Sequence, residues 1–261
     1  MDPRLREAGV KKEPLDGKDF WIFVSRRHTF STDSVLLADF AAPKPREKYL
    51  DLCSGCGIVP FLLLRDGLQQ AVGVEIEEEA VLLARQSAET LHLDDRATFL
   101  CSDLSDLSGK VEFGRFTLIT CNPPYQPVGR GLASRESSDR AARHETRCDL
   151  SGIFRQVFRL LNTSGRFCLC IRPDRLSETL CRLHEAGLEP KRLRLCSHRR
   201  GKEPFLALIE ARKCGGTGMR IADTLYLNEN GDDSEEYHRI YKHFFDGGSL
   251  LHLSKTTQAE K

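Results

Sequence analysis

Short apolar segments that alternate with amphipathic ones constrain the fold of this chain more than any other feature. The strand-like runs occupy residues 48–52, 71–76, 97–101, 116–121 and 166–171. The helix-like segments between and after them occupy residues 58–64, 77–91, 149–162 and 175–187. Strands that alternate with helices predict an α/β fold with a parallel sheet covered on both faces. Two further strands, at 191–197 and 204–210, follow one another directly, so we expect the sheet to end in an antiparallel hairpin.

The length of the chain limits its number of domains, and its net charge limits the kind of nucleic-acid binding that it can support. The chain has 261 residues, of which 40% are hydrophobic, and its 39 basic and 38 acidic residues leave a net charge of +1. We expect one Rossmann-like domain at 47–213, an N-terminal arm and extension at 1–46, and a C-terminal appendage with a frayed tail at 214–261. The first 20 or so residues are predicted to form a mobile arm. The near-neutral charge excludes a globally basic nucleic-acid coat and leaves a local basic face open.

The ten cysteines first suggest a disulfide framework, but their positions argue against one. No apolar run is long enough to cross a bilayer, and the N-terminus lacks the apolar region of a signal peptide, so we expect a reduced, cytoplasmic protein. Cys53 and Cys56 have the spacing of half a zinc site, but no second pair accompanies them, and no metal is expected. Five cysteines lie inside apolar runs, where a thiol acts as a small buried hydrophobe: Cys53, Cys121, Cys168, Cys170 and Cys196.

Glycines and acids at the ends of successive strands indicate a nucleotide-like cofactor. The first strand is followed by three residues of a ligand-binding loop: Asp51, Gly55 and Gly57. A third glycine of the dinucleotide fingerprint is absent, because Pro60 stands there, and this disfavours NAD. Glu75, at the end of the second strand, suits the hydroxyls of a ribose, and Asp103, after the third, suits an adenine amine. The alternative is that Glu75 merely begins the acidic first turn of the next helix.

The fourth strand runs directly into Asn122-Pro123-Pro124-Tyr125, which carries the expected chemistry. Ligands of open α/β sheets bind outside the carboxyl ends of the strands, where this tetrapeptide lies. The Asn122 side-chain oxygen and the Pro123 carbonyl offer two acceptors for the hydrogens of a planar amine, and Tyr125 offers a stacking face. Two acceptors stabilise the positive charge that develops as a methyl group reaches the nitrogen. The catalytic residues are therefore predicted to be Asn122, Pro123 and Tyr125. A proline-stiffened turn with a surface tyrosine is the structural alternative.

Together these features resemble the class I S-adenosylmethionine-dependent methyltransferases. The resemblance implies a seven-stranded sheet that ends in an antiparallel hairpin, with S-adenosylmethionine as cofactor. It places the loop residues near the methionine end, Glu75 at the ribose and Asp103 at the adenine, with Asn122 touching cofactor and acceptor. An Asn-Pro-Pro-Tyr motif marks methyltransferases that modify adenine in DNA or RNA, guanine N2 in ribosomal RNA, or a release-factor glutamine.

Three further segments resemble one subgroup, the bacterial tRNA(Val) adenine-N6-methyltransferases and their relatives with a "methyltransferase small" domain. These segments are FSTDSVLLADFA at 30–41, AARHET at 141–146 and LYLNENGDDSEEY at 225–237. The resemblance implies methyl transfer to an adenine beside the anticodon by a monomer, with Thr32 and Asp33 in the cofactor site. The other targets of the motif, and a non-catalytic RNA-binding protein on the same fold, remain alternatives. The short segment before the first strand counts against a release-factor enzyme, and the limited length against a DNA-modifying one.

Two basic segments are candidates for contact with RNA. A long polar loop after Tyr125 carries Arg135, Arg140, Arg143, His144 and Arg147. The turn of the terminal hairpin carries Arg199, Arg200 and Lys202. Arginine and lysine side chains in these places suit phosphate contacts. The alternative for both segments is a solvated, charged loop.

Overall fold

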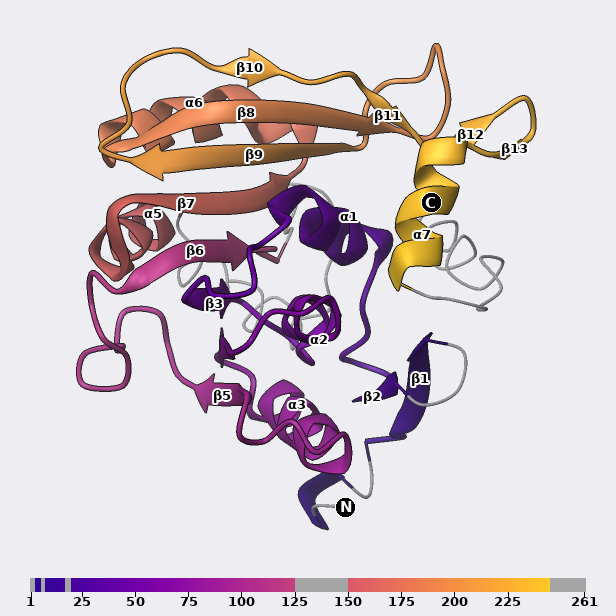
Figure 1. Ribbon diagram of the computed structural model, residues 1–261, viewed down its shortest axis with the longest axis vertical. Helices are drawn as coiled ribbons and strands as arrows, with labels where there is room; N and C mark the ends of the chain where they lie inside the picture. The colour runs from indigo at the N-terminus through magenta and orange to yellow at the C-terminus, as the bar shows by residue number, and fades with distance from the viewer. Residues whose placement is uncertain (1–2, 6–7, 17–19, 125–149, 245–261) are drawn as a thin grey trace, which may run out of the picture.

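The computed structural model describes residues 3–5, 8–16, 20–124 and 150–244, and a nine-stranded sheet forms its centre (Figure 1). The seven expected strands are β3 (Tyr49–Leu52), β4 (Ala71–Glu75), β5 (Ala97–Cys101), β6 (Phe116–Cys121), β7 (Leu161–Ile171), β8 (Leu188–Ser197) and β9 (Leu206–Lys213). They lie in the order β8-β9-β7-β6-β3-β4-β5, and β9 runs antiparallel to both of its neighbours. The predicted Rossmann-like sheet with its terminal hairpin is therefore confirmed. Two short strands, β10 (Arg220–Ile221) and β11 (Leu225–Tyr226), extend it along β8.

Helices cover both faces of the sheet and divide the core in two. On one face lie α1 (Thr32–Ala41), α2 (Ile58–Arg65), α3 (Glu78–Thr90) and α7 (Glu235–Phe244). On the other lie α5 (Leu150–Leu160) and α6 (Leu176–Glu185). Successive residues of a strand point to opposite faces, so Leu118 packs in the first core and Ile119 in the second. The side chains of Cys168 and Cys170, two residues apart on β7, consequently both point to the face that carries α1.

The N-terminal segment corrects one prediction. The prediction of a mobile arm is wrong for its described part, because β1 (Lys11–Asp16) pairs antiparallel with β2 (Phe20–Val24). Leu5, in the short helix η1 (Pro3–Leu5), and Leu15 are both almost completely buried. The backbone N–H of Phe23 donates to Ser87 on α3 at 2.8 Å, which ties the hairpin to the core. The two buried leucines and this bond together anchor a segment that is otherwise rich in charge.

The C-terminal segment corrects another. A frayed tail was expected, and residues 245–261 of it lie outside the described residues. Before them, however, α7 packs Tyr237, Ile240, Tyr241 and Phe244 into the core, a helical spacing that the sequence contained. Before it, β12 (Asn228–Glu229) and β13 (Asp232–Asp233) form a small hairpin. The expected boundary between α5 and β7 was also wrong, because β7 begins at Leu161 and continues through residues that we assigned to the helix and a turn. A short helix, η2 (Pro173–Arg175), leads from β7 into α6.

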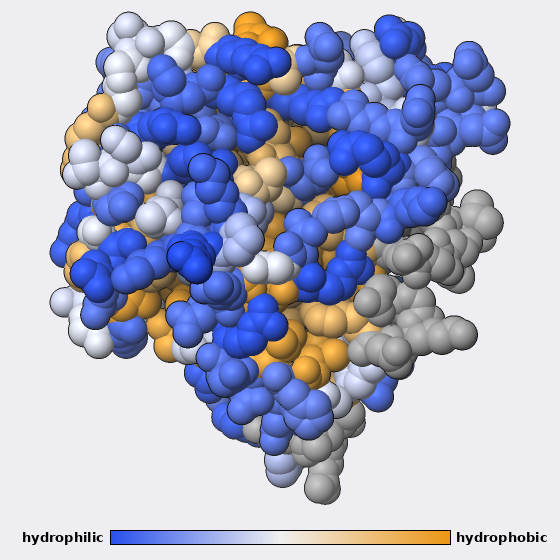
Figure 2. Space-filling model, viewed as in Figure 1, coloured by the Kyte–Doolittle hydropathy of each residue, from blue (hydrophilic) through white to orange (hydrophobic). Residues whose placement is uncertain are grey.

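The described cysteines are free thiols. Cys121, Cys168, Cys170 and Cys196 are buried as predicted, but Cys53 is only half-buried because it lies in the loop after β3. Within the described ranges no three His, Cys, Asp or Glu side chains are grouped so as to hold a metal ion. No described helix is both long and apolar enough to cross a membrane. Figure 2 shows a mostly hydrophilic face over β8 and β10, with apolar patches lower down near α2 and α3.

Candidate active site

The loop between β3 and α2 has the backbone of a ligand-binding turn. Cys53, Gly55 and Gly57 all adopt positive φ angles, of 57°, 53° and 86°. A Cβ atom on Gly57 would lie 2.8 Å from the rings of Phe61 and Phe99, so packing requires glycine there. A Cβ atom on Gly55 would meet nothing within 4 Å. The loop is therefore tightly packed against the core at Gly57 and open at Gly55, which leaves room for a ligand beside its backbone.

Glu75 links this loop to the end of β4. One carboxylate oxygen accepts from the backbone N–H of Gly55 at 2.9 Å, and the other accepts from the N–H groups of Ile76 and Glu77 at 2.7 and 3.1 Å. A carboxylate has about four lone-pair sites, so the three backbone donors leave acceptor capacity for a ligand hydroxyl. The alternative of a carboxylate that only begins α3 does not account for the bond to Gly55, because that bond reaches back to the loop.

Asp51 lies in a buried polar chain beneath the loop. The Thr120 hydroxyl donates to Asp51 Oδ1 at 2.5 Å, and the hydroxyls of Tyr49 and Thr120 lie 2.6 Å apart. Asp51 is 2% exposed, and burial raises its pKa to about 8, with Glu75 adding to the rise and the Thr120 bond opposing it. Tyr49 and Thr120 were not predicted from the sequence, since each lies within an apolar strand and gives no signal of its own.

Asp103, after β5, is half-buried in a turn. Its Oδ1 accepts from the backbone N–H and the hydroxyl of Ser105, both at 2.8 Å. These bonds fix the carboxylate at the carboxyl end of β5, beside the strand that ends in Glu75. Asp51, Glu75 and Asp103 thus lie at the carboxyl ends of three neighbouring strands, β3, β4 and β5.

Asn122 follows β6 and is held from two sides. Its side-chain nitrogen donates to the Ser34 hydroxyl on α1 at 3.1 Å, and its oxygen accepts from the Cys170 thiol on β7 at 3.1 Å. Pro123 is buried, whereas Tyr125 lies outside the described residues. Ser34 and Cys170 were not predicted from the sequence, because they are 88 and 48 residues from Asn122.

Helix α1 brings Thr32 and Asp33 to the same region. The Tyr241 hydroxyl of α7 donates to the Thr32 hydroxyl at 3.1 Å. Asp33 lies in the first turn of α1, and burial raises its pKa to about 6 against the opposing charge of Arg172, which follows β7. Because Ser34 contacts Asn122, the first turn of α1 lies beside the predicted catalytic segment.

Of the two basic segments predicted to contact RNA, the structure describes only the turn of the terminal hairpin. Arg135, Arg140, Arg143, His144 and Arg147 lie outside the described residues. Arg199, Arg200 and Lys202 are exposed in the turn between β8 and β9, as the sequence suggested. Arg200 pairs with Glu229 at 3.2 Å and lies over the ring of Tyr226, so part of the charge of this turn is neutralised by the β12–β13 hairpin.

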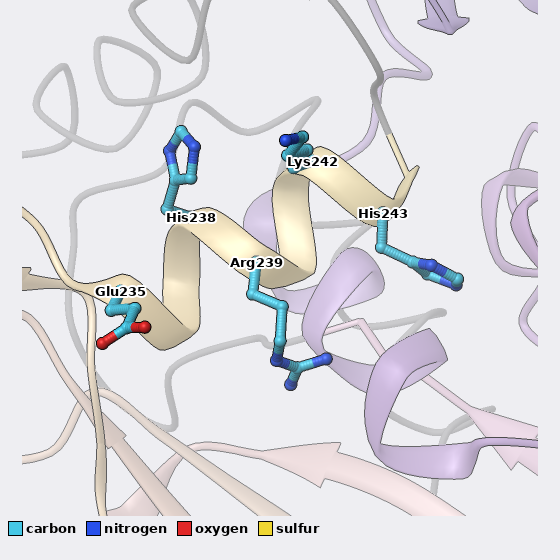
Figure 3. A pocket seen from close by; sticks show the side chains of 5 residues that line it. All are labelled: Glu235, His238, Arg239, Lys242 and His243. Atoms are coloured by element: carbon cyan, nitrogen blue, oxygen red, sulfur yellow. The ribbon is translucent and has the colours of Figure 1, made fainter.

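A surface hollow on α7 is separate from the loop after β3. It is lined by Glu235, His238, Arg239, Lys242 and His243, all from the one helix. His238 and Lys242 project from one side of α7, and Glu235 and Arg239 from the other (Figure 3). Arg239 pairs with Asp39 of α1 at 3.7 Å, and His243 with Asp66 at 2.8 Å. These pairs fasten α7 to the body of the molecule.

The residues present fit S-adenosylmethionine. The open position at Gly55 leaves space beside the loop, and Glu75 retains acceptor capacity next to it. Asp51 is a buried carboxyl with a raised pKa, and a nearby cationic group would stabilise its ionised form. The loop offers space for the cofactor, Glu75 offers an acceptor for its ribose hydroxyls, and Asp51 offers a carboxylate for its positively charged end.

The fold and these strand ends define a class I S-adenosylmethionine-dependent methyltransferase. A family model described as a methyltransferase domain matches residues 43–211, more than half of the chain. The chain belongs to this family. Its structure is similar to that of a predicted O-methyltransferase, protein Atu636 from Agrobacterium tumefaciens, with a TM-score of 0.66 and 17% identity over 82% of this chain and 97% of that one. Geranyl diphosphate C-methyltransferase from Streptomyces coelicolor, solved with S-adenosyl-L-homocysteine, has a TM-score of 0.50 at 15% identity and covers 69% of this chain and 77% of that one.

Curated proteins of similar sequence include several tRNA1(Val) (adenine(37)-N6)-methyltransferases. The tRNA1(Val) (adenine(37)-N6)-methyltransferase of Shewanella halifaxensis is 27% identical over 166 residues, which span 64% of this chain and 65% of that protein. Its namesake in Tolumonas auensis is 28% identical over 182 residues, 68% of this chain and 73% of that protein. The first match thus spans slightly less than two thirds of the relative's own length.

Proposed function

We propose that this methyltransferase transfers a methyl group to the N6 amine of an adenine in tRNA, next to the anticodon of tRNA(Val). The observation that carries the proposal is the position of Asn122 and Pro123 at the end of β6, with the Asn122 amide fixed from two sides. The names of the curated relatives agree with it. A tRNA substrate also implies a cytoplasmic enzyme, and a monomer suffices for the roles assigned below.

Asn122 and Pro123 suit the weak nucleophile that an adenine amine presents. The lone pair of this nitrogen is delocalised into the ring, so it must be made available before it attacks. The Asn122 oxygen has a second lone pair besides the one that faces Cys170, and the Pro123 carbonyl is a further acceptor. Acceptors for both amine hydrogens stabilise the charge that develops on nitrogen. Tyr125 is assigned the stacking face for the extruded base.

The cofactor side holds and orients the methyl donor. S-Adenosylmethionine, when bound, supplies a methyl group activated by its attachment to a sulfonium. Asp51 and the backbone of Gly55 and Gly57 are assigned to its methionine end, Glu75 to the ribose and Asp103 to the adenine. Thr32 and Asp33, on α1, and Asn122, just after β6, are also assigned to the cofactor site, at its border with the acceptor. Alignment of the acceptor nitrogen with the methyl–sulfur bond is then the main contribution to the rate.

Recognition of tRNA is assigned to basic groups around this site. Arg199 and Lys202 are exposed in the β8–β9 turn and, among the residues that the structure describes, take part in no ion pair. Together with Arg200 they suit contacts to phosphates. We assign the same role to Arg135, Arg140, Arg143, His144 and Arg147. Replacing Arg199 and Lys202 with Ser should raise the KM for RNA and flatten its salt dependence.

Incubation of the full chain with labelled S-adenosylmethionine and separate pools of tRNA, ribosomal RNA, DNA and protein tests the proposal. We expect label in tRNA, and nucleoside analysis should identify it as N6-methyladenosine. A tRNA(Val) transcript with guanine in place of the adenine next to the anticodon is the matched control and should gain no label. Label in ribosomal guanine, a glutamine side chain or DNA would instead assign one of the other targets. Cofactor binding without transfer to any pool would favour a non-catalytic RNA-binding protein.

A further inference from the structure

The environment of Asn122 contains a feature that the proposed chemistry does not by itself require. The amide at the end of β6 contacts two side chains from different elements, Ser34 on α1 and Cys170 on β7. Ser34 is 5% exposed and Cys170 is fully buried. Both partners are thus buried and the two contacts are partly shielded from solvent, where a hydrogen bond fixes its partners more firmly than it does in water.

The two contacts meet opposite ends of the amide. Ser34 accepts from the nitrogen and Cys170 donates to the oxygen, each at 3.1 Å. A single contact would leave the amide plane free to rotate about its terminal torsion, which is broad in asparagine. Contacts at both ends select one orientation of the plane. The remaining lone pair of the oxygen then has a fixed direction.

The elements that carry the two contacts are themselves anchored. The C-terminal carbonyls of α1 accept from arginines of the sheet, Phe40 from Arg192 at 2.6 Å and Ala41 from Arg166 at 3.1 Å. Its first turn is tied to α7 through the bond from Tyr241 to Thr32. Helix α1 is thus held at both ends, and Ser34 has little freedom to move away from Asn122.

We propose that Ser34 and Cys170 are positioning residues that aim the Asn122 oxygen at the acceptor amine. They touch neither cofactor nor acceptor in this account and act through the asparagine. The inference rests on the role proposed above for Asn122. Since a misaligned acceptor slows the chemical step and leaves binding intact, loss of either contact should lower kcat and leave KM unchanged.

Four variants of the full chain separate positioning from packing. Cys170→Ala and Ser34→Ala remove one contact each, and Cys170→Ser keeps a donor at the same place. Cys168→Ala is the matched control, because Cys168 is equally buried, on the same strand and the same face, and two residues away. We expect about threefold to tenfold lower kcat for Cys170→Ala and Ser34→Ala, from the usual net worth of one hydrogen bond. Cys170→Ser and Cys168→Ala should stay within about twofold of the unmodified protein.

A second readout does not depend on any acceptor. The side-chain amide resonance of Asn122, assigned by its loss in Asn122→Asp, is measured by NMR in the cofactor-free protein. We expect a single sharp pair of signals in the unmodified chain, broadened or shifted in Cys170→Ala and restored in Cys170→Ser. Unchanged signals together with unchanged kcat in Cys170→Ala and Ser34→Ala would overturn the proposal, as would an equal loss of kcat in Cys168→Ala. If the amide responds but tRNA adenine is not methylated, the positioning role stands and the proposed acceptor is wrong.

Discussion

The two sides of the active-site region are built in different ways. The cofactor side consists of the ends of β3, β4 and β5, and its central contact, from Gly55 to Glu75, joins residues 20 positions apart. The acceptor side is assembled from α1, β6, β7 and α7, and it meets the cofactor side at Thr32, Asp33 and Asn122, which are also assigned to the cofactor. Its contacts join Ser34 to Asn122 across 88 residues and Thr32 to Tyr241 across 209. The cofactor side is built from contacts between successive strand ends, whereas the acceptor side depends on contacts between segments far apart in the sequence.

Because of this difference, we expect substitutions on the two sides to impair different properties of the protein. Changes on the cofactor side should alter stability and cofactor affinity. Changes on the acceptor side should alter the rate of transfer and leave the cofactor bound. The substitutions below test this separation, beginning with the largest expected effect.

Gly57→Ala tests how tightly the cofactor loop is packed. The new Cβ would lie 2.8 Å from two phenylalanine rings at a positive φ of 86°, so strain and overpacking combine. We expect the free energy of unfolding to fall by about 3 kcal/mol, measured by urea denaturation. Gly67→Ala is the control, since its φ is 99° but nothing lies within 4 Å of its Cβ. It should cost about 1 kcal/mol. Equal losses would show that packing at Gly57 contributes nothing.

Glu75→Ala tests the cofactor contact itself. It removes the acceptor of the Gly55 N–H and the group assigned to the ribose. We expect cofactor affinity to fall by about thirtyfold, from the usual worth of hydrogen bonds to a charged group. Isothermal titration measures the loss. Glu78→Ala, which removes only an exposed pair with Arg4, should leave affinity unchanged. A normal affinity in Glu75→Ala would leave Glu75 with a purely structural role between β4 and α3.

Asp51 gives the cofactor side a pH dependence. Burial raises its pKa to about 8, so below that pH the carboxyl is protonated in the free protein. A cationic group in the cofactor stabilises the carboxylate, so binding releases a proton and affinity rises with pH up to about 8. We expect an increase of roughly tenfold between about pH 6 and 8. Subtracting the profile of Asp51→Asn removes the titration of the cofactor itself. Identical profiles would mean that Asp51 does not sense the cofactor's charge.

Tyr241→Phe should have the smallest effect. It removes the hydroxyl that donates to Thr32 and keeps the ring in the core. We expect about 1 kcal/mol lower stability and kcat reduced by about twofold to threefold, with cofactor affinity unchanged. Tyr226→Phe, on the edge strand β11, is the matched control and should change neither quantity. A loss of affinity in Tyr241→Phe would show that α7 supports the cofactor side as well.

The sequence predicted the sheet well, and it located the candidate cofactor residues at strand ends, for a physical reason. Apolar runs of strand length and helical periodicity are local signals, and Gly55, Glu75 and Asp103 each follow such a run. The parts that it missed depend on tertiary contacts. The burial of Leu15 in the N-terminal hairpin, the polar chain beneath Asp51 and the contact from Cys170 to Asn122 have no local pattern. Helix α7 is the exception, because the spacing of Tyr237, Ile240, Tyr241 and Phe244 was visible and was passed over in a polar segment.

Isothermal titration of S-adenosylmethionine into Asn122→Ala, paired with the transfer rate of the same preparation, tests the separation of the two sides most directly. The account predicts that cofactor affinity stays within about threefold of the unmodified protein while methyl transfer falls by at least about a hundredfold, the scale of losing one acceptor of developing charge. Asn162→Ala, at a partly exposed position on β7, is the control and should match the unmodified protein in both. An equal loss of affinity and transfer would contradict the account, because Asn122 would then belong to the cofactor side.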